Sequence, residues 1–208
     1  MLYRVFANVN GGKSLYALDK VVNKQYENVL IISNELTESK YINRLHTYQT
    51  NTNKKVVNKI RVKFISLNAS EEILTYIENS IENPFGSDNK YDCILFDGYY
   101  QGHFENSQTF NDELTRISNE NSIDIITTNN LRREYFDLNF DQKMKQFETL
   151  RNELLEGQEY ILLHTDRIES KNEENKNLLY SNIYELRNNM IRTFNINQYF
   201  PKTVKEEQ

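Results

Sequence analysis

Residues 2–14 read LYRVFANVNGGKS, and this stretch decides how the chain begins to fold. The run from Leu2 to Ala7 is short and apolar, as expected of a buried β-strand. A pair of glycines follows, and the amphipathic stretch 13–25 then has the spacing of a helix. A strand that passes through a glycine turn into a helix is the first half of a βαβ unit. The opening residues therefore predict an α/β fold.

The same alternation of short apolar runs and amphipathic stretches continues along the chain. It predicts strands at 2–7, 28–33, 60–66, 91–97, 123–128 and 159–164, and helices at 13–25, 37–49, 70–83, 107–121 and 138–156. The runs VLII (29–32) and CILF (93–96) are continuous, which is typical of parallel strands buried on both faces. Two further strands, at 183–187 and 191–196, predict an antiparallel pair near the C-terminus. We expect one domain over residues 1–200 and a short tail over 201–208.

Composition narrows the classes of protein that fit. The chain has 208 residues and 25 Tyr and Phe side chains, which can fill a core although hydrophobic residues make up only 38%. A single cysteine excludes an internal disulfide. We find neither a signal peptide nor an apolar run of the roughly 20 residues that a membrane helix needs. These features predict a cytoplasmic protein without membrane contact, and the net charge of −5 gives no global nucleic-acid signature.

The turn between the first strand and the first helix has the composition of a phosphate-binding loop. Residues 7–14, ANVNGGKS, follow the pattern G-x-x-x-x-G-K-[ST], with Ala7 in place of the first glycine. Glycines let backbone N–H groups point at a polyphosphate, and the helix N-terminus adds partial positive charge. We therefore predict a site for ATP and Mg²⁺ in which Lys13 reaches the β- and γ-phosphates and the Ser14 hydroxyl ligates the metal. The predicted ATP-binding residues are Asn8, Asn10, Gly11, Gly12, Lys13, Ser14 and Leu15.

A second candidate residue lies at the end of another predicted strand. Residues 91–97 read YDCILFD, an apolar strand that ends in Asp97. The carboxyl ends of parallel strands meet at one edge of a sheet, where ligands bind. A carboxylate beside a phosphate loop can hold Mg²⁺ or its water shell. We predict that Asp97 completes the metal site with Ser14.

A third motif resembles a known family. Residues 29–36, VLIISNEL, form a strand that ends in Ser-x-Glu, and this resembles the second core strand of DnaB-type replicative helicases. The likeness continues through residues 37–45, where those helicases carry a helix ending in Arg-Leu. The resemblance implies a RecA-like P-loop NTPase core. It also implies that Glu35 polarises the water that attacks ATP.

Two later motifs extend the resemblance to most of the chain. Residues 125–134, IITTNNLRRE, look like the family's strand that senses the γ-phosphate, with Asn130 in the place of the family's glutamine. Residues 184–189, YELRNN, resemble the strand that offers basic residues to a neighbour's ATP. This implies that Arg187 or Arg192 acts in trans, in a homo-oligomer or with other replication proteins. The chain begins at the first strand, as an isolated RecA-like core would.

Aromatic and basic residues follow two of the predicted strands. In RecA-like motors DNA meets the corresponding loops, where aromatic faces stack on bases and arginines contact phosphates. The resemblance therefore implies contact with single-stranded DNA through Tyr99, Tyr100, Arg132 and Arg133. The function implied is ATP binding and hydrolysis in DNA replication or recombination.

Two other functions fit the same phosphate loop. The segment GKSLYA (12–17) also looks like the start of zonular occludens toxin-like phage assembly ATPases. Those proteins usually place an acidic residue after the metal-binding aspartate, whereas Gly98 follows Asp97 here. A third reading is a nucleotide-dependent interaction protein with weak or no hydrolysis. Ala7 and Asn130, which both depart from the motor pattern, favour that reading.

Overall fold

A computed structural model describes residues 1–8, 10–33, 35–53, 61–65, 71–82, 90–99, 107–131, 133–167 and 179–199 of the chain. The strands are β1 (Leu2–Ala7), β2 (Asn28–Ser33), β3 (Arg61–Ile65), β4 (Cys93–Tyr99), β5 (Asp124–Asn130), β6 (Gln158–Arg167), β7 (Leu179–Glu185) and β8 (Met190–Asn195). The α-helices are α1 (Lys13–Asn23), α2 (Glu38–Thr52), α3 (Glu71–Glu82), α4 (Ser107–Asn121) and α5 (Phe140–Glu148). Short 3₁₀ helices are η3 (Arg133–Tyr135), η4 (Thr149–Glu153) and η6 (Ile196–Tyr199).

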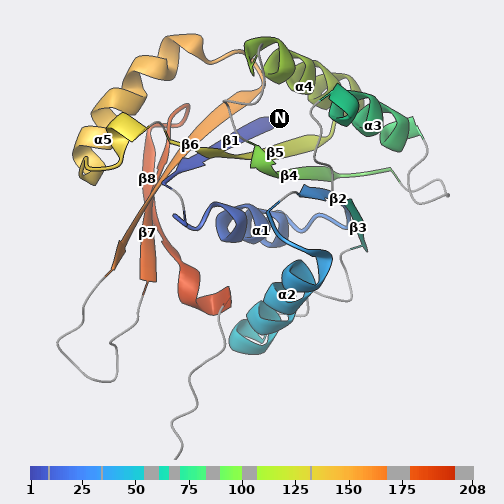
Figure 1. Cartoon of the computed structure of the whole chain (residues 1–208), viewed down its shortest axis with the longest axis horizontal. Coiled ribbons are helices and arrows are strands. Elements are labelled where there is room, and N and C mark those ends of the chain that lie inside the picture. Colours follow the sequence, from blue (N-terminus) through green and yellow to red (C-terminus); the bar gives the residue numbers. More distant parts are fainter. Residues whose placement is uncertain are drawn as a thin grey trace, which may run out of the picture.

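The described strands form one sheet in the order β3-β2-β4-β5-β1-β6-β7-β8 (Figure 1). Strands β1 to β6 run parallel to one another, β7 pairs antiparallel with β6, and β8 pairs antiparallel with β7. This confirms the predicted mixed α/β fold with a mainly parallel sheet and antiparallel strands at its C-terminal side. The order also places β5 between β1 and β4, so the carboxyl ends of these three strands lie side by side at one edge of the sheet.

The predicted position of the first C-terminal strand was wrong by several residues. The range 183–187 was expected to be a strand, but β7 ends at Glu185 and residues 186–189 turn back into β8. Asn189 has a φ of 49°, a left-handed conformation that asparagine tolerates better than most residues. The chain reverses there because Glu185 pairs with Met190 across the hairpin.

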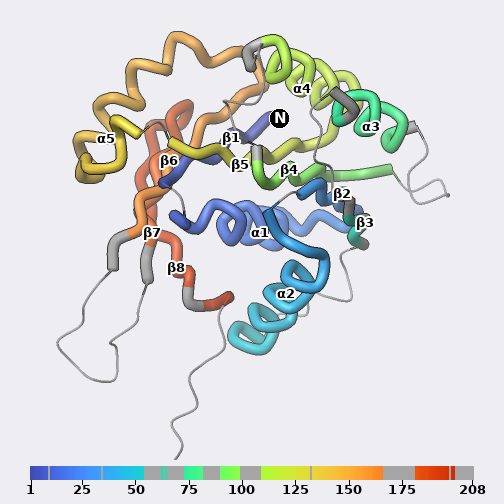
Figure 2. The backbone as a smooth tube through the Cα atoms, in the orientation of Figure 1, coloured from blue at the N-terminus to red at the C-terminus, as the bar shows by residue number. Residues whose placement is uncertain are grey.

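Helices cover both faces of the sheet. Figures 1 and 2 show α1 and α2 on one face and α3, α4 and α5 on the other. The apolar run in β2 is continuous because both faces of this strand are buried. Val29 and Ile31 belong to the core under α1 and α2, whereas Leu30 and Ile32 belong to the core under α3 and α4. A strand buried on both faces needs apolar residues at every position.

The helix predicted over residues 138–156 is shorter than expected. It begins after Asn139, whose side chain accepts a hydrogen bond from Gln142 N while the Gln142 side chain accepts one from Asn139 N. This reciprocal cap fixes the start of α5. The α-helix ends at Glu148, and the chain continues as the tighter 3₁₀ helix η4 to Glu153. Gly157 lies beyond both, with a φ of 81°.

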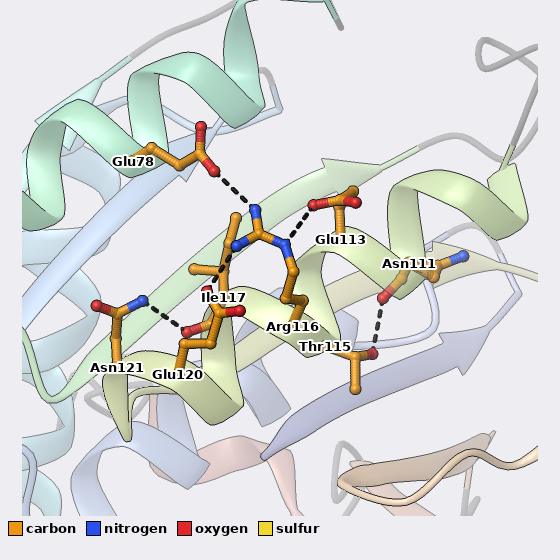
Figure 3. Close-up of polar contacts among 8 residues, drawn as sticks. All are labelled: Glu78, Asn111, Glu113, Thr115, Arg116, Ile117, Glu120 and Asn121. Atoms are coloured by element: carbon orange, nitrogen blue, oxygen red, sulfur yellow. Dashed lines mark hydrogen bonds and ion pairs between the residues drawn. The ribbon is translucent and has the colours of Figure 1, made fainter.

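Helices α3 and α4 are joined across their exposed faces by Arg116. Figure 3 shows its guanidinium reaching Glu78 on α3, with an N–O distance of 2.8 Å. It also contacts Glu113 and Glu120 of its own helix, at 2.7 and 2.6 Å. All four side chains are at least 41% exposed, so these ion pairs are screened by solvent and contribute little to stability.

Lys20 allows a test of how α1 packs against β1. Its ammonium lies 3.9 Å from the centroid of the Tyr3 ring, and burial lowers its pKa to about 8, although Glu185 opposes this. Because the unfolded chain then binds more protons between about pH 8 and 10.4, stability should rise with pH over that window. At pH 7 the buried charge is a net cost, partly offset by the contact with the ring. We expect Lys20→Met to raise the free energy of unfolding by about 1–2 kcal/mol at pH 7.

Urea denaturation of the wild type and Lys20→Met at pH 7 and pH 10 would measure this effect. The difference between the two proteins should shrink at the higher pH, because the lysine is then largely neutral in the folded state. Lys24→Met, at the C-cap of the same helix, is the control, since Lys24 is exposed. A Lys20→Met variant less stable than the wild type at pH 7 would contradict the expectation.

Candidate functional site

The loop after β1 is a tight turn that only glycine can complete. The Gly11 amide donates to the Asn8 carbonyl at 2.9 Å. A Cβ atom on residue 11 would lie 2.8 Å from both the Ala7 Cβ and the Asn8 carbonyl oxygen. Those neighbours belong to or adjoin the backbone, so neither could move aside cheaply. The tight approach to Ala7 is thus accommodated by the glycine at residue 11.

The first turn of α1 presents its amides to the end of this loop. Gly12 precedes the helix in a left-handed conformation with a φ of 83°, and it has no side chain to cap the helix. The first helical hydrogen bond runs from Tyr16 N to Gly12 O, at 2.9 Å. The amides from Gly12 to Leu15 therefore precede the helical ladder, and the first turn carries no acidic residue. Such a helix end attracts anions.

Lys13 lies at the centre of the site. Its side chain is 6% exposed, and its ammonium donates to the Asn8 carbonyl at 3.2 Å and to Asn130 Oδ1 at 2.7 Å. Burial lowers the pKa of Lys13, and the negative charges of Glu35 and Asp97 oppose that shift. The structure thus brings together three predicted residues, Lys13, Asn130 and Asp97, from α1, β5 and β4.

Asp97 is fully buried and is surrounded by hydroxyl groups. Its Oδ1 accepts from Ser14 at 2.9 Å and from Thr128 at 2.7 Å, and its Oδ2 accepts from Tyr41. The aspartate was predicted to end its strand, but β4 continues to Tyr99 with an irregular register against β5. Gly98 allows this with a φ of 103°, and its amide donates to Thr128 Oγ1 at 3.0 Å. Asp97 thus lies within the irregular part of β4 where it accepts from Ser14.

Burial keeps the Tyr41 hydroxyl in its protonated form. Desolvation raises the pKa of Tyr41 well above its ordinary value, and the charge of Asp97 raises it further. The tyrosine is therefore a hydrogen-bond donor to the carboxylate at any physiological pH.

Glu35 lies in the turn between β2 and α2. The Ser33 hydroxyl accepts from the Glu35 amide at 3.2 Å and from the Leu36 amide at 3.0 Å, which orders this turn. Glu35 itself is exposed, and its charge acts on Lys13. The predicted catalytic glutamate is therefore at the same edge of the sheet as the phosphate loop.

The hairpin of β6 and β7 supports the loop from its other side. Thr165 Oγ1 donates to the Gly11 carbonyl at 2.9 Å and lies 2.6 Å from Ser181 Oγ. Sequence reasoning missed both residues, and it also missed Tyr41 and Thr128 as partners of Asp97. Only Thr128 had a usable signal, because it lies in the polar run TTNN (127–130) at the end of an otherwise apolar strand.

The residues predicted to contact DNA are only partly described. Tyr99 ends β4, but its side chain is outside the described part, as are Tyr100 and Arg132. Arg133 is exposed in η3, shortly after Asn130. This arginine lies at the edge of the sheet that carries the phosphate loop.

The two arginines predicted to act in trans are held by their own chain. Arg187 donates to the carbonyls of Gln158 and Leu155, at 2.7 and 2.5 Å. Because Gln158 begins β6, Arg187 lies at the edge of the sheet opposite the phosphate loop. Arg192 on β8 donates to Glu185 at 2.6 Å and to the Tyr16 hydroxyl at 2.7 Å.

The residues around Asp97 fit a magnesium ion that is shared with a bound phosphate. Mg²⁺ in such sites uses one or two protein oxygens and takes its other ligands from phosphate and water. Ser14 and Asp97 supply a hydroxyl and a carboxylate within 2.9 Å of each other. Within the described ranges no group of three His, Cys, Asp or Glu side chains could hold a metal by protein ligands alone.

No protein-family model matches the sequence, and no curated protein matches it either. None of the helices in the described part is long and apolar enough to cross a membrane.

Proposed function

We propose that this chain binds ATP with Mg²⁺, hydrolyses it, and acts on DNA in replication or recombination, as RecA/DnaB-type proteins do. The observation that carries the proposal is the meeting of Lys13, Ser14 and Asp97 beside a helix N-terminus. A lysine, a hydroxyl and a carboxylate around free backbone amides are what a metal-bound triphosphate requires.

The phosphates would bind along the loop and the first turn of α1. The amides from Gly12 to Leu15 would donate to phosphate oxygens, and the Lys13 ammonium would neutralise their charge. Lys13 carries only donors, so its contact with Asn130 must be made by the amide oxygen. That orientation leaves the Asn130 NH₂ group to donate to the terminal phosphate.

Ser14 and Asp97 would hold the magnesium ion. The Ser14 proton is already directed to Asp97, which leaves the lone pairs of the hydroxyl available for the metal. When bound, Mg²⁺ supplies charge stabilisation for phosphoryl transfer to water. Thr128 and Tyr41 keep the carboxylate in one orientation for this role.

Glu35 would orient the attacking water. Its carboxylate is exposed next to the phosphate loop, and the Ser33 hydroxyl fixes the turn that carries it. An ordered water between Glu35 and the terminal phosphate would be placed for in-line attack. Arg133, exposed beyond β5, would contact the phosphates of single-stranded DNA at the same edge of the sheet.

Titration calorimetry with ATP, with and without millimolar Mg²⁺, tests the binding step. We expect micromolar affinity that depends on Mg²⁺. Phosphate release measured with and without a single-stranded oligonucleotide tests ATP hydrolysis and its link to DNA. We expect DNA to stimulate turnover, and we expect added salt to weaken this stimulation. Absence of heat with ATP and Mg²⁺ would contradict the whole proposal. Binding without turnover would favour the nucleotide-dependent interaction protein.

A further inference from the structure

The peptide between Gly11 and Gly12 is the least constrained link of the phosphate loop. Neither residue carries a Cβ atom, so backbone sterics alone do not decide on which side of the loop the carbonyl lies. An anion distinguishes the two orientations, because a carbonyl oxygen directed at a phosphate repels it and an N–H group binds it. A group outside the two glycines must therefore select the orientation.

The strand pair β6–β7 makes this selection through two hydroxyl groups. Thr165 Oγ1 donates to the Gly11 carbonyl at 2.9 Å and lies 2.6 Å from Ser181 Oγ. The carbonyl can only accept, so the single Thr165 proton is directed to it, and Ser181 must donate the hydrogen bond between the hydroxyls. Ser181 is fully buried and lies opposite Thr165 in the register of the two strands. The donors thus run in one direction, from Ser181 through Thr165 to Gly11, and each polarises the next.

The contact with the Gly11 carbonyl also fixes the direction of the Gly12 amide. No peptide bond in the described part of the chain is cis, and in a planar trans peptide the C=O and N–H groups point in opposite directions. The Gly12 N–H is therefore directed away from Thr165. Among the described residues, none accepts a hydrogen bond from this amide. A Cβ atom on Gly12 would lie 3.2 Å from Ile196 Cδ1, so η6 packs against this residue and limits its movement.

We propose that Thr165, with Ser181 behind it, is a positioning residue that sets the Gly11–Gly12 peptide so that its amide donates to a phosphate group of ATP. The inference rests on the proposed function, because the amide has this role only if a phosphate binds at the loop. It adds the means by which a loop with two permissive glycines is set before ATP arrives. An amide that is already oriented does not have to be ordered on binding, which favours affinity.

Thr165→Val is the direct test, because valine keeps the branched shape of threonine and removes the hydroxyl. Titration calorimetry with ATP is carried out in Mg²⁺ and in excess chelator. We expect affinity to fall about tenfold in both, the loss typical of one hydrogen bond to a charged group. The amide contacts phosphate with or without the metal, so the ratio of the two affinities should keep its wild-type value. Thr165→Ser retains the hydroxyl and should restore affinity close to that of the wild type.

The NMR signal of the Gly12 amide separates positioning from a general loss of structure. Gly11 and Gly12 form the only Gly-Gly pair in the sequence. In protein labelled with glycine that carries ¹³C at the carbonyl and ¹⁵N at the nitrogen, only the Gly12 nitrogen is therefore bonded to a labelled carbonyl. We expect ATP to move the Gly12 amide proton downfield in the wild type and in Thr165→Ser. In Thr165→Val the shift should be clearly smaller.

Thr52→Val is the matched control. Thr52 is half-buried like Thr165, and its hydroxyl also donates to a backbone carbonyl, that of Tyr48, at 2.8 Å within α2. We expect this variant to bind ATP as the wild type does. Thermal melting of every variant shows whether it remains folded.

Ser181→Ala tests the same chain by a second route, because it leaves Thr165 in place and removes the donor behind it. It should lower ATP affinity less than Thr165→Val does, and the double variant should be no worse than Thr165→Val alone. Should Thr165→Val not fold, Ser181→Ala decides, since wild-type affinity together with a wild-type Gly12 signal in that variant would contradict the inference.

Three results would overturn the positioning role while the wild type still binds ATP. They are wild-type affinity in Thr165→Val, equal losses in Thr165→Val and Thr165→Ser, and a Gly12 signal that responds to ATP in Thr165→Val as it does in the wild type. A wild type that binds no ATP would instead overturn the proposed function, and the inference with it.

Discussion

Replacing Lys13 by alanine is expected to weaken the binding of ATP with Mg²⁺ by at least about 100-fold, because the site loses its central positive charge. A unit charge about 4 Å from a phosphate is worth about 4 kcal/mol at the effective dielectric constant of a protein surface, before the cost of desolvation. The ammonium is held by two contacts, with the Asn8 carbonyl and with Asn130 Oδ1, at the end of the phosphate loop. Calorimetry with the wild type and the variant in Mg²⁺ measures the loss.

The same substitution should leave the fold intact. Burial lowers the pKa of Lys13, which means that the folded state disfavours its charge. Alanine removes that cost together with two hydrogen bonds, so we expect the free energy of unfolding to change by less than about 1 kcal/mol. Lys24→Ala, at the exposed end of the same helix, is the control for a lost positive charge. Near-normal ATP affinity in Lys13→Ala would rule out the phosphate-binding role of the loop.

Asp97→Asn is expected to abolish the gain in ATP affinity that Mg²⁺ provides, and to lower any turnover by at least about 100-fold. The amide oxygen can still accept from Ser14 and Thr128, so the variant keeps the shape of the site. It loses the negative charge that attracts the metal. Affinity for ATP in excess chelator should stay equal or increase, since a negative charge near the phosphates has been removed. Calorimetry in Mg²⁺ and in chelator distinguishes these effects.

Asp124→Asn provides the matched control for Asp97→Asn. Asp124 begins β5, at the opposite edge of the sheet from Asn130, and pairs with the N-terminal ammonium at 2.8 Å. Its substitution removes one negative charge without touching the phosphate loop, so the dependence of ATP affinity on Mg²⁺ should remain. A Mg²⁺ dependence that survives in Asp97→Asn would show that the carboxylate does not hold the metal.

Most of the fold could be predicted because its signals are local. Apolar runs and helical spacing placed β1 to β6 and α1 to α4 within a few residues. The ends of the elements were harder, since they depend on packing. The predicted helix 138–156 ends as α5 at Glu148, and the predicted strand 183–187 contains the turn into β8. The order of the strands could not be read from spacing at all.

In the candidate site, too, the residues that are close in sequence could be predicted and the distant ones could not. The glycines, Lys13 and Ser14 are adjacent in the chain, so a sequence motif was enough to predict them. The partners of the site are far apart in sequence: Tyr41 is 56 residues from Asp97, and Thr165 is 154 residues from Gly11. No periodicity links such pairs, because their contact depends on where the sheet places β4 and β6.

By itself the sequence determined the α/β alternation and the loop that precedes Lys13, because both follow from the conformational preferences of neighbouring residues. The tertiary structure alone decided that Lys13 contacts Asn130, that three hydroxyls hold Asp97, and that Arg187 lies at the opposite edge from the loop. The physical reason is that β5 lies between β1 and β4 in the sheet. Parallel pairing then brings the carboxyl ends of these three strands, and the side chains they carry, to one place.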